Sequence, residues 1–542
     1  MRGVGAALTL GLAVLASGCA ATPHYVPPTH TYYLSPDGDD GAAGTSPETA
    51  WRTPARADRT GLAPGDRLLL KGGAHFRGTL TVSPDEAGDP RRPAVIGSYG
   101  TGRATLSSTA DPAVTVHNTG GVEIRDLVLR GSGSARRHDP GLQLYSDRGS
   151  GGRPSGIDVS GVDVSGFRIG LAVGASQHGV GFRDVTVDRT RLHGNKDSGF
   201  LSYGPDFKPE IGTYAHEDLT LTDVAAYDNA GDPRAHDRHT GDGIVVGAVR
   251  GATLRRVEAH DNGTEAASDA PEGPVGVWAY DSTRVVVEHS AAYRNHTGST
   301  VDGAGFGLDS NVTESALRRN LSFGNDGPGF YAYQRWQNGG SARNTISDNI
   351  SADDGRGLPR HGSIAVYGKD VQDLAIVRNT VIVSRSPEGP GAALRLQAGE
   401  RDVVVRDNLF VTGDVPLVLA DAGLKPANVV LQGNAYRAAH GTWQVRWGEH
   451  TYDSLASWRA ADGQESVDGH PTGLTVDPCL KGGPLPRIRS VADADLATPT
   501  CTSLAGEGLA LPLPAGAPQP GDADYFGRTP SGGPQVGAVV PR

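Results

Sequence analysis

The chain has 542 residues, including 77 glycines and 36 prolines, with 6% aromatic residues, 37% hydrophobic residues and a net charge of −11. Glycine and proline oppose helix interiors, so this composition excludes a helical bundle and favours many short strands, in several domains or one elongated repeat. The hydrophobic content excludes wholesale disorder, and the negative charge argues against a nucleic-acid partner.

Residues 1–18 have the features of a lipoprotein signal peptide. A basic residue precedes an apolar run over 4–16, which is too short to span a membrane. The run ends in Leu15-Ala-Ser-Gly-Cys19, which resembles a bacterial lipobox. On this interpretation Cys19 carries lipid, residues 19–31 form a tether, and the protein lies outside the cytoplasm, held to the cell membrane by its lipid alone. Secretion without lipid, after cleavage near residue 20 or 21, is the alternative.

An alternating pattern recurs about every thirty residues through the middle of the chain. Eight copies end at a turn, and they occupy 185–190, 219–224, 252–257, 285–290, 314–320, 344–349, 374–379 and 403–408. The last four end in Asn320, Asn349, Asn379 and Asn408, at one register, where stacked amides can hydrogen-bond along a ladder. A second strand precedes the first in each repeat and starts at glycine or serine, at 199–203, 243–247, 276–280, 305–309, 329–333 and 363–367. This pattern predicts a parallel β-solenoid.

Two N-terminal segments, Tyr32-Tyr-Leu-Ser-Pro-Asp-Gly-Asp-Asp40 and Gly65-Asp-Arg-Leu-Leu-Leu-Lys-Gly-Gly73, resemble the start of pectate-lyase-like β-helix proteins. The resemblance covers 32–436 and implies an all-β, right-handed parallel β-helix. It does not define the reaction, because the superfamily includes lyases, hydrolases, epimerases and adhesins. Residues 437–542 are then expected to form a C-terminal cap, with a short helix at 452–459, and an extended tail.

Cysteine usage adds one covalent constraint. Besides Cys19, the chain has only Cys479 and Cys501, which are 22 residues apart. Because the chain is expected to leave the cytoplasm, these two cysteines are expected to form a disulfide.

Alternation in the glycine-led strands assigns their faces. Positions one and three after the glycine are mostly apolar and point inward, so positions two and four point outward. The fourth positions of successive rungs are Tyr203, Gly247, Tyr280, Asp309, Tyr333 and Tyr367, and the second positions add Trp278 and Tyr331. These aromatic residues predict an exposed aromatic strip, interrupted by one carboxylate, on which sugar rings can stack. Stacking between strands, or a covering loop, is the alternative explanation.

Carboxylates gather on the same rungs, and glycoside hydrolysis needs two of them. The candidate catalytic residues are Asp309, Asp302, Asp242 and Asp326. Asp302 and Asp326 each lie three residues before a strand glycine, so they are expected to be neighbours. The segment Asp302-Gly-Ala-Gly-Phe-Gly-Leu-Asp309 resembles the paired-aspartate segment of β-helix glycosidases such as glycoside hydrolase family 136, which implies an acid/base and a nucleophile. An extended span would separate the two by about 23 Å, so they act together only if the chain turns at 303–305.

Two other functions remain open, a calcium-dependent polysaccharide lyase and a non-catalytic glycan-binding surface protein. The lyase needs a base and Ca²⁺ held by aspartates. Its ligands would be Asp242, Asp302 and Asp326, and its base Arg335, Lys369 or Lys196. A glycan-binding surface protein would have the aromatic strip without a close pair of carboxylates. The hydrolase, in contrast, is expected to need no metal or cofactor.

Two loops are expected beside the groove. The loop 237–242 offers His239 as a base or substrate contact, and Arg335 is a further candidate contact. The acidic insertion 265–272 is the second loop. In all three functions the expected partner is a polysaccharide or oligosaccharide.

Overall fold

The computed structural model describes residues 29–109, 111–133, 140–149, 152–335, 339–358, 361–385, 391–530 and 533–541. The predicted signal peptide, Cys19 and all but the last residues of the predicted tether lie outside this range. Within it, no helix combines the length and the apolar character needed to cross a membrane.

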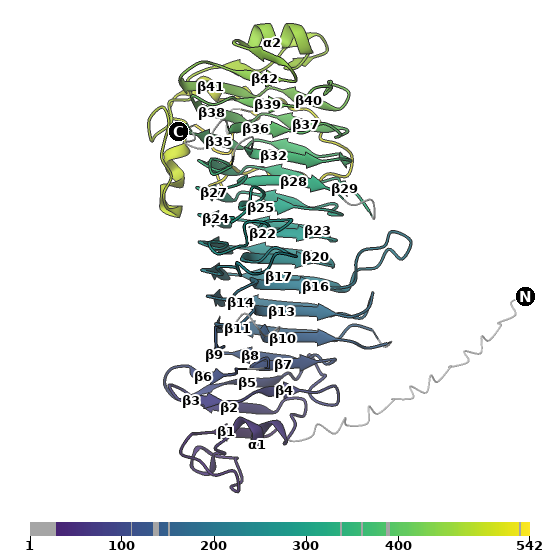
Figure 1. Ribbon diagram of the computed structural model, residues 1–542, viewed down its shortest axis with the longest axis vertical. Helices are drawn as coiled ribbons and strands as arrows, with labels where there is room; N and C mark the ends of the chain where they lie inside the picture. Colours follow the sequence, from purple (N-terminus) through teal and green to yellow (C-terminus); the bar gives the residue numbers. More distant parts are fainter. Residues whose placement is uncertain are drawn as a thin grey trace, which may run out of the picture.

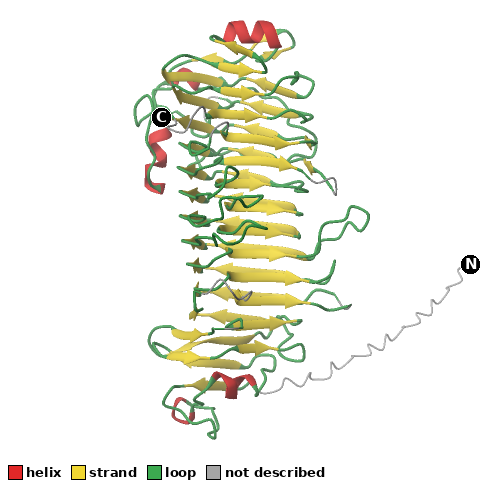
Figure 2. Ribbon diagram, viewed as in Figure 1, coloured by secondary structure: helices red, strands yellow, loops and turns green. Residues whose placement is uncertain are grey.

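The chain winds into a right-handed parallel β-helix, which confirms the predicted fold (Figures 1 and 2). Three sheets run along the solenoid, and each contains 14 of the described strands. Successive strands of one sheet come from successive turns of the chain, so each sheet stacks equivalent segments of the repeat, except that the last strand of the second sheet folds back in antiparallel pairing.

The first sheet holds the eight alternating segments predicted from the repeat, as β14 to β37. Its strands are β1 (Thr31–Leu34), β2 (Arg67–Lys71), β5 (Ala94–Tyr99), β8 (Val122–Arg125), β11 (Ser155–Ser160), β14 (Arg183–Asp188), β17 (His216–Thr222), β20 (Val249–Arg255), β23 (Thr283–Glu288), β26 (Ala316–Arg318), β30 (Thr345–Ser347), β34 (Ala375–Val377), β37 (Val403–Arg406) and β40 (Val429–Gln432).

The second sheet holds the glycine-led strands, as β16, β19, β22, β25, β28 and β32. Its strands are β4 (Leu80–Val82), β7 (Val114–His117), β10 (Pro140–Ser146), β13 (Ile169–Ala175), β16 (Ser198–Tyr203), β19 (Asp242–Gly247), β22 (Val275–Tyr280), β25 (Ala304–Leu308), β28 (Phe330–Gln334), β32 (Gly362–Gly368), β36 (Ala392–Leu396), β39 (Val418–Ala420), β42 (Val445–Trp447) and β43 (His450–Tyr452).

The third sheet closes each turn. Its strands are β3 (His75–Arg77), β6 (Ala104–Ser107), β9 (Leu127–Arg130), β12 (Asp163–Ser165), β15 (Arg191–His193), β18 (Ala225–Tyr227), β21 (Glu258–His260), β24 (Ala291–Tyr293), β27 (Leu321–Phe323), β31 (Ile350–Ala352), β35 (Thr380–Val383), β38 (Leu409–Gly413), β41 (Ala435–His440) and β46 (Leu474–Thr475).

Few other elements occur among the described residues. The two-stranded pairs are β29 (Ser341–Ala342) with β33 (Val371–Gln372) and β44 (Ser466–Val467) with β45 (His470–Pro471), the α-helices are α1 (Pro54–Asp58) and α2 (Leu455–Asp462), and the 3-10 helices are Pro47–Thr49, Val491–Ala497 and Thr502–Leu504.

Buried asparagines hydrogen-bond along the solenoid, as the register of the repeat predicts. The Nδ2 of Asn349 donates to Oδ1 of Asn379 at 3.0 Å, and the Nδ2 of Asn379 donates to Asn408 at 2.9 Å. This ladder ends when Asn434 donates to Oε1 of Glu465 at 2.8 Å. A second ladder, which the sequence did not reveal, comprises Asn195, Asn229, Asn262, Asn295 and Asn325 and ends on Asp354. Each ladder therefore fixes one corner of the coil and ends on a carboxylate acceptor.

The C-terminal region closes the solenoid and then returns along it. Parallel pairing continues beyond residue 436, where the repeat pattern fades, because β42 pairs with β39 and β46 pairs with β41. Helix α2 then covers the end of the coil (Figure 1). The following tail packs apolar side chains, including Val536 and Val539, against the third sheet, and the Cys479–Cys501 disulfide joins two of its segments.

Candidate active site

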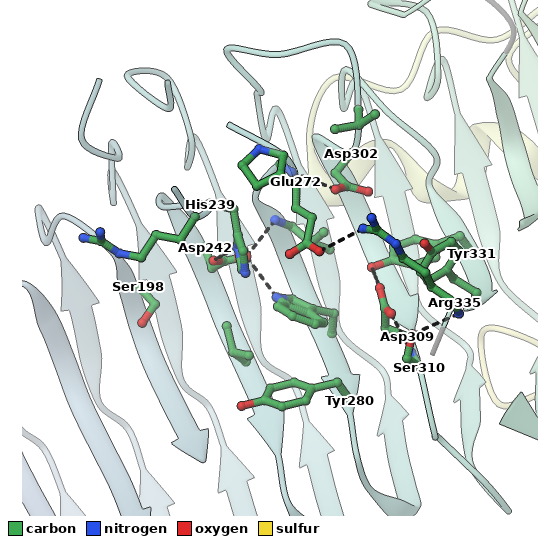
Figure 3. A pocket seen from close by; sticks show the side chains of 18 of the residues that line it. Ser198, His239, Asp242, Glu272, Tyr280, Asp302, Asp309, Ser310, Tyr331 and Arg335 are labelled. Carbon is green, nitrogen blue, oxygen red and sulfur yellow. Dashed lines mark hydrogen bonds and ion pairs between the residues drawn. The ribbon is translucent and has the colours of Figure 1, made fainter. Parts of the chain in front are cut away.

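A cavity of about 1100 Å³ lies on the outer face of the second sheet (Figure 3). Its lining includes Asp197, His239, Asp242, Glu272, Trp278, Tyr280, Asp302, Asp309, Tyr331, Tyr333, Arg335, His361 and Tyr367. Many of these residues precede a strand: His239 precedes β19, Glu272 precedes β22 and Asp302 precedes β25. Parallel strands begin at one edge of their sheet, so the loops before them stack along that edge and enclose the outer face.

The strand register confirms the predicted order of the outward positions. Gly247 pairs with Tyr280, Tyr333 pairs with Tyr367, and the backbone N–H of Asp309 donates to Ala279 at 2.9 Å. Asp309 therefore lies between the rungs of Tyr280 and Tyr333, on the carboxyl side of β25. The glycines at outward positions have a packing role, because a Cβ on Gly307 would lie 2.3 Å from the Tyr331 ring.

The prediction that the strip is exposed is wrong. Tyr331 is only 4% exposed, and Trp278, Tyr333 and Tyr367 are partly buried against an apolar cluster that includes Val275. The members of this cluster lie on the neighbouring strands β22, β25, β28 and β32, so packing between strands buries the rings, which is one of the alternatives that the sequence left open. Tyr203 lies on the same face but is not among the residues lining the cavity.

Asp302 and Asp309 line the same cavity because the chain turns just before β25. Asp302 and Gly303 have φ values of 58° and 68°, so the corner that joint action requires is present. The Oδ2 of Asp302 accepts a hydrogen bond from the Gly273 backbone N–H at 2.8 Å. Asp309 accepts from the backbone N–H of Ser310 at 2.5 Å and from the hydroxyl of Tyr331 at 3.1 Å.

The cavity raises the pKa of both carboxyls. Removal from water and, to a smaller extent, the charge of Asp309 raise the pKa of Asp302 to about 7, although the hydrogen bond from Gly273 opposes this change. Removal from water also raises the pKa of Asp309 to about 6, although the hydrogen bonds from Ser310 and Tyr331 oppose that change. Near neutral pH, Asp302 therefore keeps a proton more readily than Asp309 does.

Asp242 lines the cavity, but three groups from two segments of the chain contact its carboxylate. Its Oδ1 accepts from the Val275 backbone N–H and from Nε1 of Trp278, both at 2.9 Å. Its Oδ2 lies 2.9 Å from Nδ1 of His239. Burial lowers the pKa of His239, because it opposes a charge on the ring. The negative charge of Asp242 and smaller contributions from Glu272 and Asp302 together outweigh burial and raise the pKa of His239 to about 9.

Asp326 lies on the turn next to Asp302, as predicted, but it is not among the residues lining the cavity. It accepts a hydrogen bond from the Thr297 backbone N–H at 3.1 Å and lies 3.3 Å from Nδ1 of His296. Its carboxylate therefore holds the preceding loop and does not meet the Asp302–Asp309 pair. Among the described residues, no three His, Cys, Asp or Glu side chains converge as ligands for a metal ion.

The other predicted contacts divide into two groups. Arg335 lines the cavity and pairs with Glu272 at 3.3 Å, so the acidic insertion does lie beside the groove (Figure 3). Lys196 and Lys369 are not among the lining residues, and Lys196 pairs with Glu265 at 3.0 Å.

Sequence reasoning missed several lining residues. His361 contacts the Tyr367 hydroxyl at 3.1 Å, and Arg168 pairs with Asp197 at the other end of the cavity. Burial lowers the pKa of His361 to about 4. The available signal was positional, since Asp197 and His361 both lie in loops just before glycine-led strands.

Comparison with known proteins yields short sequence matches. No family model matches the chain. A stretch of 94 residues is 32% identical to alpha-1,3-galactosidase A of Akkermansia muciniphila and covers 15% of each protein. A stretch of 104 residues is 34% identical to lacto-N-biosidase of Bifidobacterium longum subsp. longum, covering 18% of this chain and 6% of that protein. The matched regions are thus small parts of these curated relatives.

Solved structures share the fold over a much longer range. The GH136 lacto-N-biosidase from Eubacterium ramulus superimposes with a TM-score of 0.50 at 14% identity, over 76% of this chain and 67% of that chain. XylC in complex with xylose superimposes with a TM-score of 0.50 at 9% identity, over 94% and 98% of the two chains. These similarities confirm the β-helix architecture.

Proposed function

We propose that this protein is a carbohydrate-active enzyme that hydrolyses a glycosidic bond with Asp302 and Asp309. One observation carries the proposal: two carboxyls seven positions apart enter one aromatic cavity, and both have raised pKa values. A glycosidase needs one carboxyl that holds a proton and one that is ionised at the same pH.

The roles follow from the hydrogen bonds to the two carboxyls, because two donors stabilise the ionised form of Asp309 and only one donor among the described residues contacts Asp302. Asp302, with the higher pKa, protonates the leaving oxygen of the scissile bond. Asp309, ionised and held by Ser310 and Tyr331, attacks the anomeric carbon or activates a water molecule for that attack. Trp278, Tyr280 and Tyr333 supply apolar faces for the sugar rings on either side.

Two kinds of similarity support a carbohydrate substrate. The curated proteins with matching stretches are named as a galactosidase and a lacto-N-biosidase. The cavity places aromatic rings beside carboxylates, a combination that suits sugar C–H faces and hydroxyls.

A digest of a panel of oligosaccharides and polysaccharides tests the proposal. Products are read both as new reducing ends and as absorbance of unsaturated uronates, with and without EDTA. New reducing ends without new absorbance, abolished by Asp309→Asn, are the expected result. Absorbance that requires divalent cations would replace the hydrolase with the lyase, and binding without any product would favour the non-catalytic binder.

We also propose that the enzyme works outside the cytoplasm, anchored by lipid on Cys19. The lipobox-like sequence before Cys19 and the Cys479–Cys501 disulfide support this location. In bacterial cells producing the full chain, labelled palmitate should enter the protein and should be lost in Cys19→Ser. Equal labelling of both proteins would contradict the anchor.

A further inference from the structure

Asp242 differs from the Asp302–Asp309 pair in how its carboxylate is used. It is 3% exposed, and its two oxygens meet the Val275 backbone, the Trp278 indole and the His239 ring. A carboxylate has about four lone-pair positions, so three contacts leave little for a substrate atom. Asp309, in contrast, is partly exposed to the cavity.

The three groups that Asp242 joins come from two parts of the chain. His239 lies in the loop before β19, Val275 begins β22, and Trp278 lies within β22. The His239 ring packs against Trp278 with centroids 5.5 Å apart, and Trp278 packs against Tyr280 at 5.3 Å. Asp242 therefore connects a loop to a strand and fixes the rings that form one side of the cavity (Figure 3).

We infer that Asp242 is a positioning residue, which holds His239 and Trp278 as a rigid wall that binds one substrate sugar on the β22 side of Asp309. The inference rests on the proposed function and refines it, because it removes Asp242 from the candidate reacting carboxyls. It also places the sugar that the enzyme selects between this wall and the Asp302–Asp309 pair.

The chemistry of the wall suits a neutral sugar unit with hydroxyl or carbonyl oxygens. Trp278 offers an apolar ring for C–H faces, and Glu272 lines the cavity as an acceptor. His239 uses Nδ1 toward Asp242, so Nε2 is the ring nitrogen left to donate to a sugar oxygen. Sites that hydrogen-bond a substrate group discriminate strongly against analogues lacking it, so the wall sets specificity and not only affinity.

The test compares two substitutions at Asp242. In Asp242→Asn the amide oxygen still accepts from Val275 and Trp278, whereas Asp242→Ala releases both Trp278 and His239. We expect Asp242→Asn to keep kcat within about ten-fold, and Asp242→Ala to raise KM at least about ten-fold with a smaller loss of kcat. These constants are measured on the panel oligosaccharide that the unsubstituted protein cleaves. Loss of kcat by several orders of magnitude in Asp242→Asn, equal to that in Asp309→Asn, would overturn the inference.

A matched control lies elsewhere on the solenoid. Asp163 on β12 pairs with His193 at 3.1 Å, and neither residue lines the cavity. Asp163→Ala also breaks a carboxylate–histidine pair, and it should leave KM unchanged. If Asp163→Ala raised KM as much as Asp242→Ala does, the effect would come from the fold in general, and the inference of a binding wall would be wrong.

Binding measurements separate this inference from the proposed function. Calorimetric titration with the same panel oligosaccharides, in an Asp309→Asn background, reports affinity without turnover. If the unsubstituted protein cleaves nothing but binds an oligosaccharide, and Asp242→Ala weakens that binding, the hydrolase proposal fails while the wall is supported. If the Asp242→Ala variant binds the oligosaccharide as tightly as the protein that keeps Asp242, the inference of a binding wall is refuted. It is also refuted if no sugar of the panel binds.

Discussion

We expect the hydroxyl of Tyr331 to set the position of the acidic limb in the pH profile of the proposed hydrolysis. Asp309 must be ionised and Asp302 protonated, so kcat/KM should rise through a pKa of about 6 and fall through a pKa of about 7. Tyr331 donates to Oδ2 of Asp309 at 3.1 Å and thereby stabilises the ionised form. Tyr331→Phe removes this donor, which raises the pKa of Asp309 and moves the acidic limb to higher pH.

The size of the shift follows from the contact. A hydrogen bond to a charged group is worth about 1.5–3 kcal/mol, and one pKa unit corresponds to about 1.4 kcal/mol. Because 3.1 Å is long for a bond between hydroxyl and carboxylate, we expect the lower end, a shift of about one unit. The two limbs would then nearly coincide near pH 7, and the maximum of the profile would fall by about two-fold.

The assay is kcat/KM on the cleaved oligosaccharide between pH 4 and pH 9. Tyr333→Phe is the control, since it removes a hydroxyl from the other outward tyrosine of β28. Its acidic limb should stay in place, although its affinity for substrate can change. An acidic limb that moves in neither variant, or moves toward lower pH in Tyr331→Phe, would refute the role given to Asp309.

Three further substitutions test other parts of the structure. Asp302→Asn removes the proton donor, so initial rates should fall by several orders of magnitude on oligosaccharides and much less on aryl glycosides, whose leaving groups need no proton; equal losses on both would contradict the acid role. Asn379→Ala removes the acceptor of the Asn349 backbone N–H and a donor to the Ile346 carbonyl, and urea titration should show a loss of about 3 kcal/mol in unfolding free energy; an unchanged midpoint would argue against the ladder. Replacing Cys479 and Cys501 with serine opens a loop of 22 residues and should cost about 3 kcal/mol in the same titration, with no further loss on adding reductant.

The fold was predictable because its determinants are local and repeated. Each turn of the coil presents a glycine-led strand and an alternating strand, so one period appears many times in the sequence. The asparagine at the end of the alternating strand marks a corner whose geometry recurs. The second ladder escaped notice because Asn195 to Asn325 follow the third sheet, whose strands β15 to β27 are only three residues long. Three residues carry too little alternation to signal a strand.

The sequence predicted the site residues whose orientation depends on strand alternation. It did not predict which residues the loops bring into the cavity. Asp309 follows β25 directly, so strand geometry alone orients it. Asp302 and Asp326 occupy equivalent positions before their strand glycines, yet only Asp302 enters the cavity. Asp302 bonds to the backbone of Gly273 in the loop before β22, whereas Asp326 bonds to Thr297. Loop length decides which backbone N–H each carboxylate meets, and no sequence period encodes loop length.

The burial of the site, which alternation did not predict, also makes acid catalysis feasible in the proposed mechanism. On an exposed strip, Asp302 and Asp309 would titrate near the ordinary value of about 4, and both would be ionised at neutral pH. No proton would then be available for the leaving oxygen. Because burial in the cavity removes both carboxyls from water, the pKa of Asp302 rises to about 7, while donors from Ser310 and Tyr331 keep that of Asp309 lower. In the proposed mechanism, burial in the cavity separates two identical side chains into an acid and a base, and this separation depends on the surroundings of the aspartates as much as on the aspartates themselves.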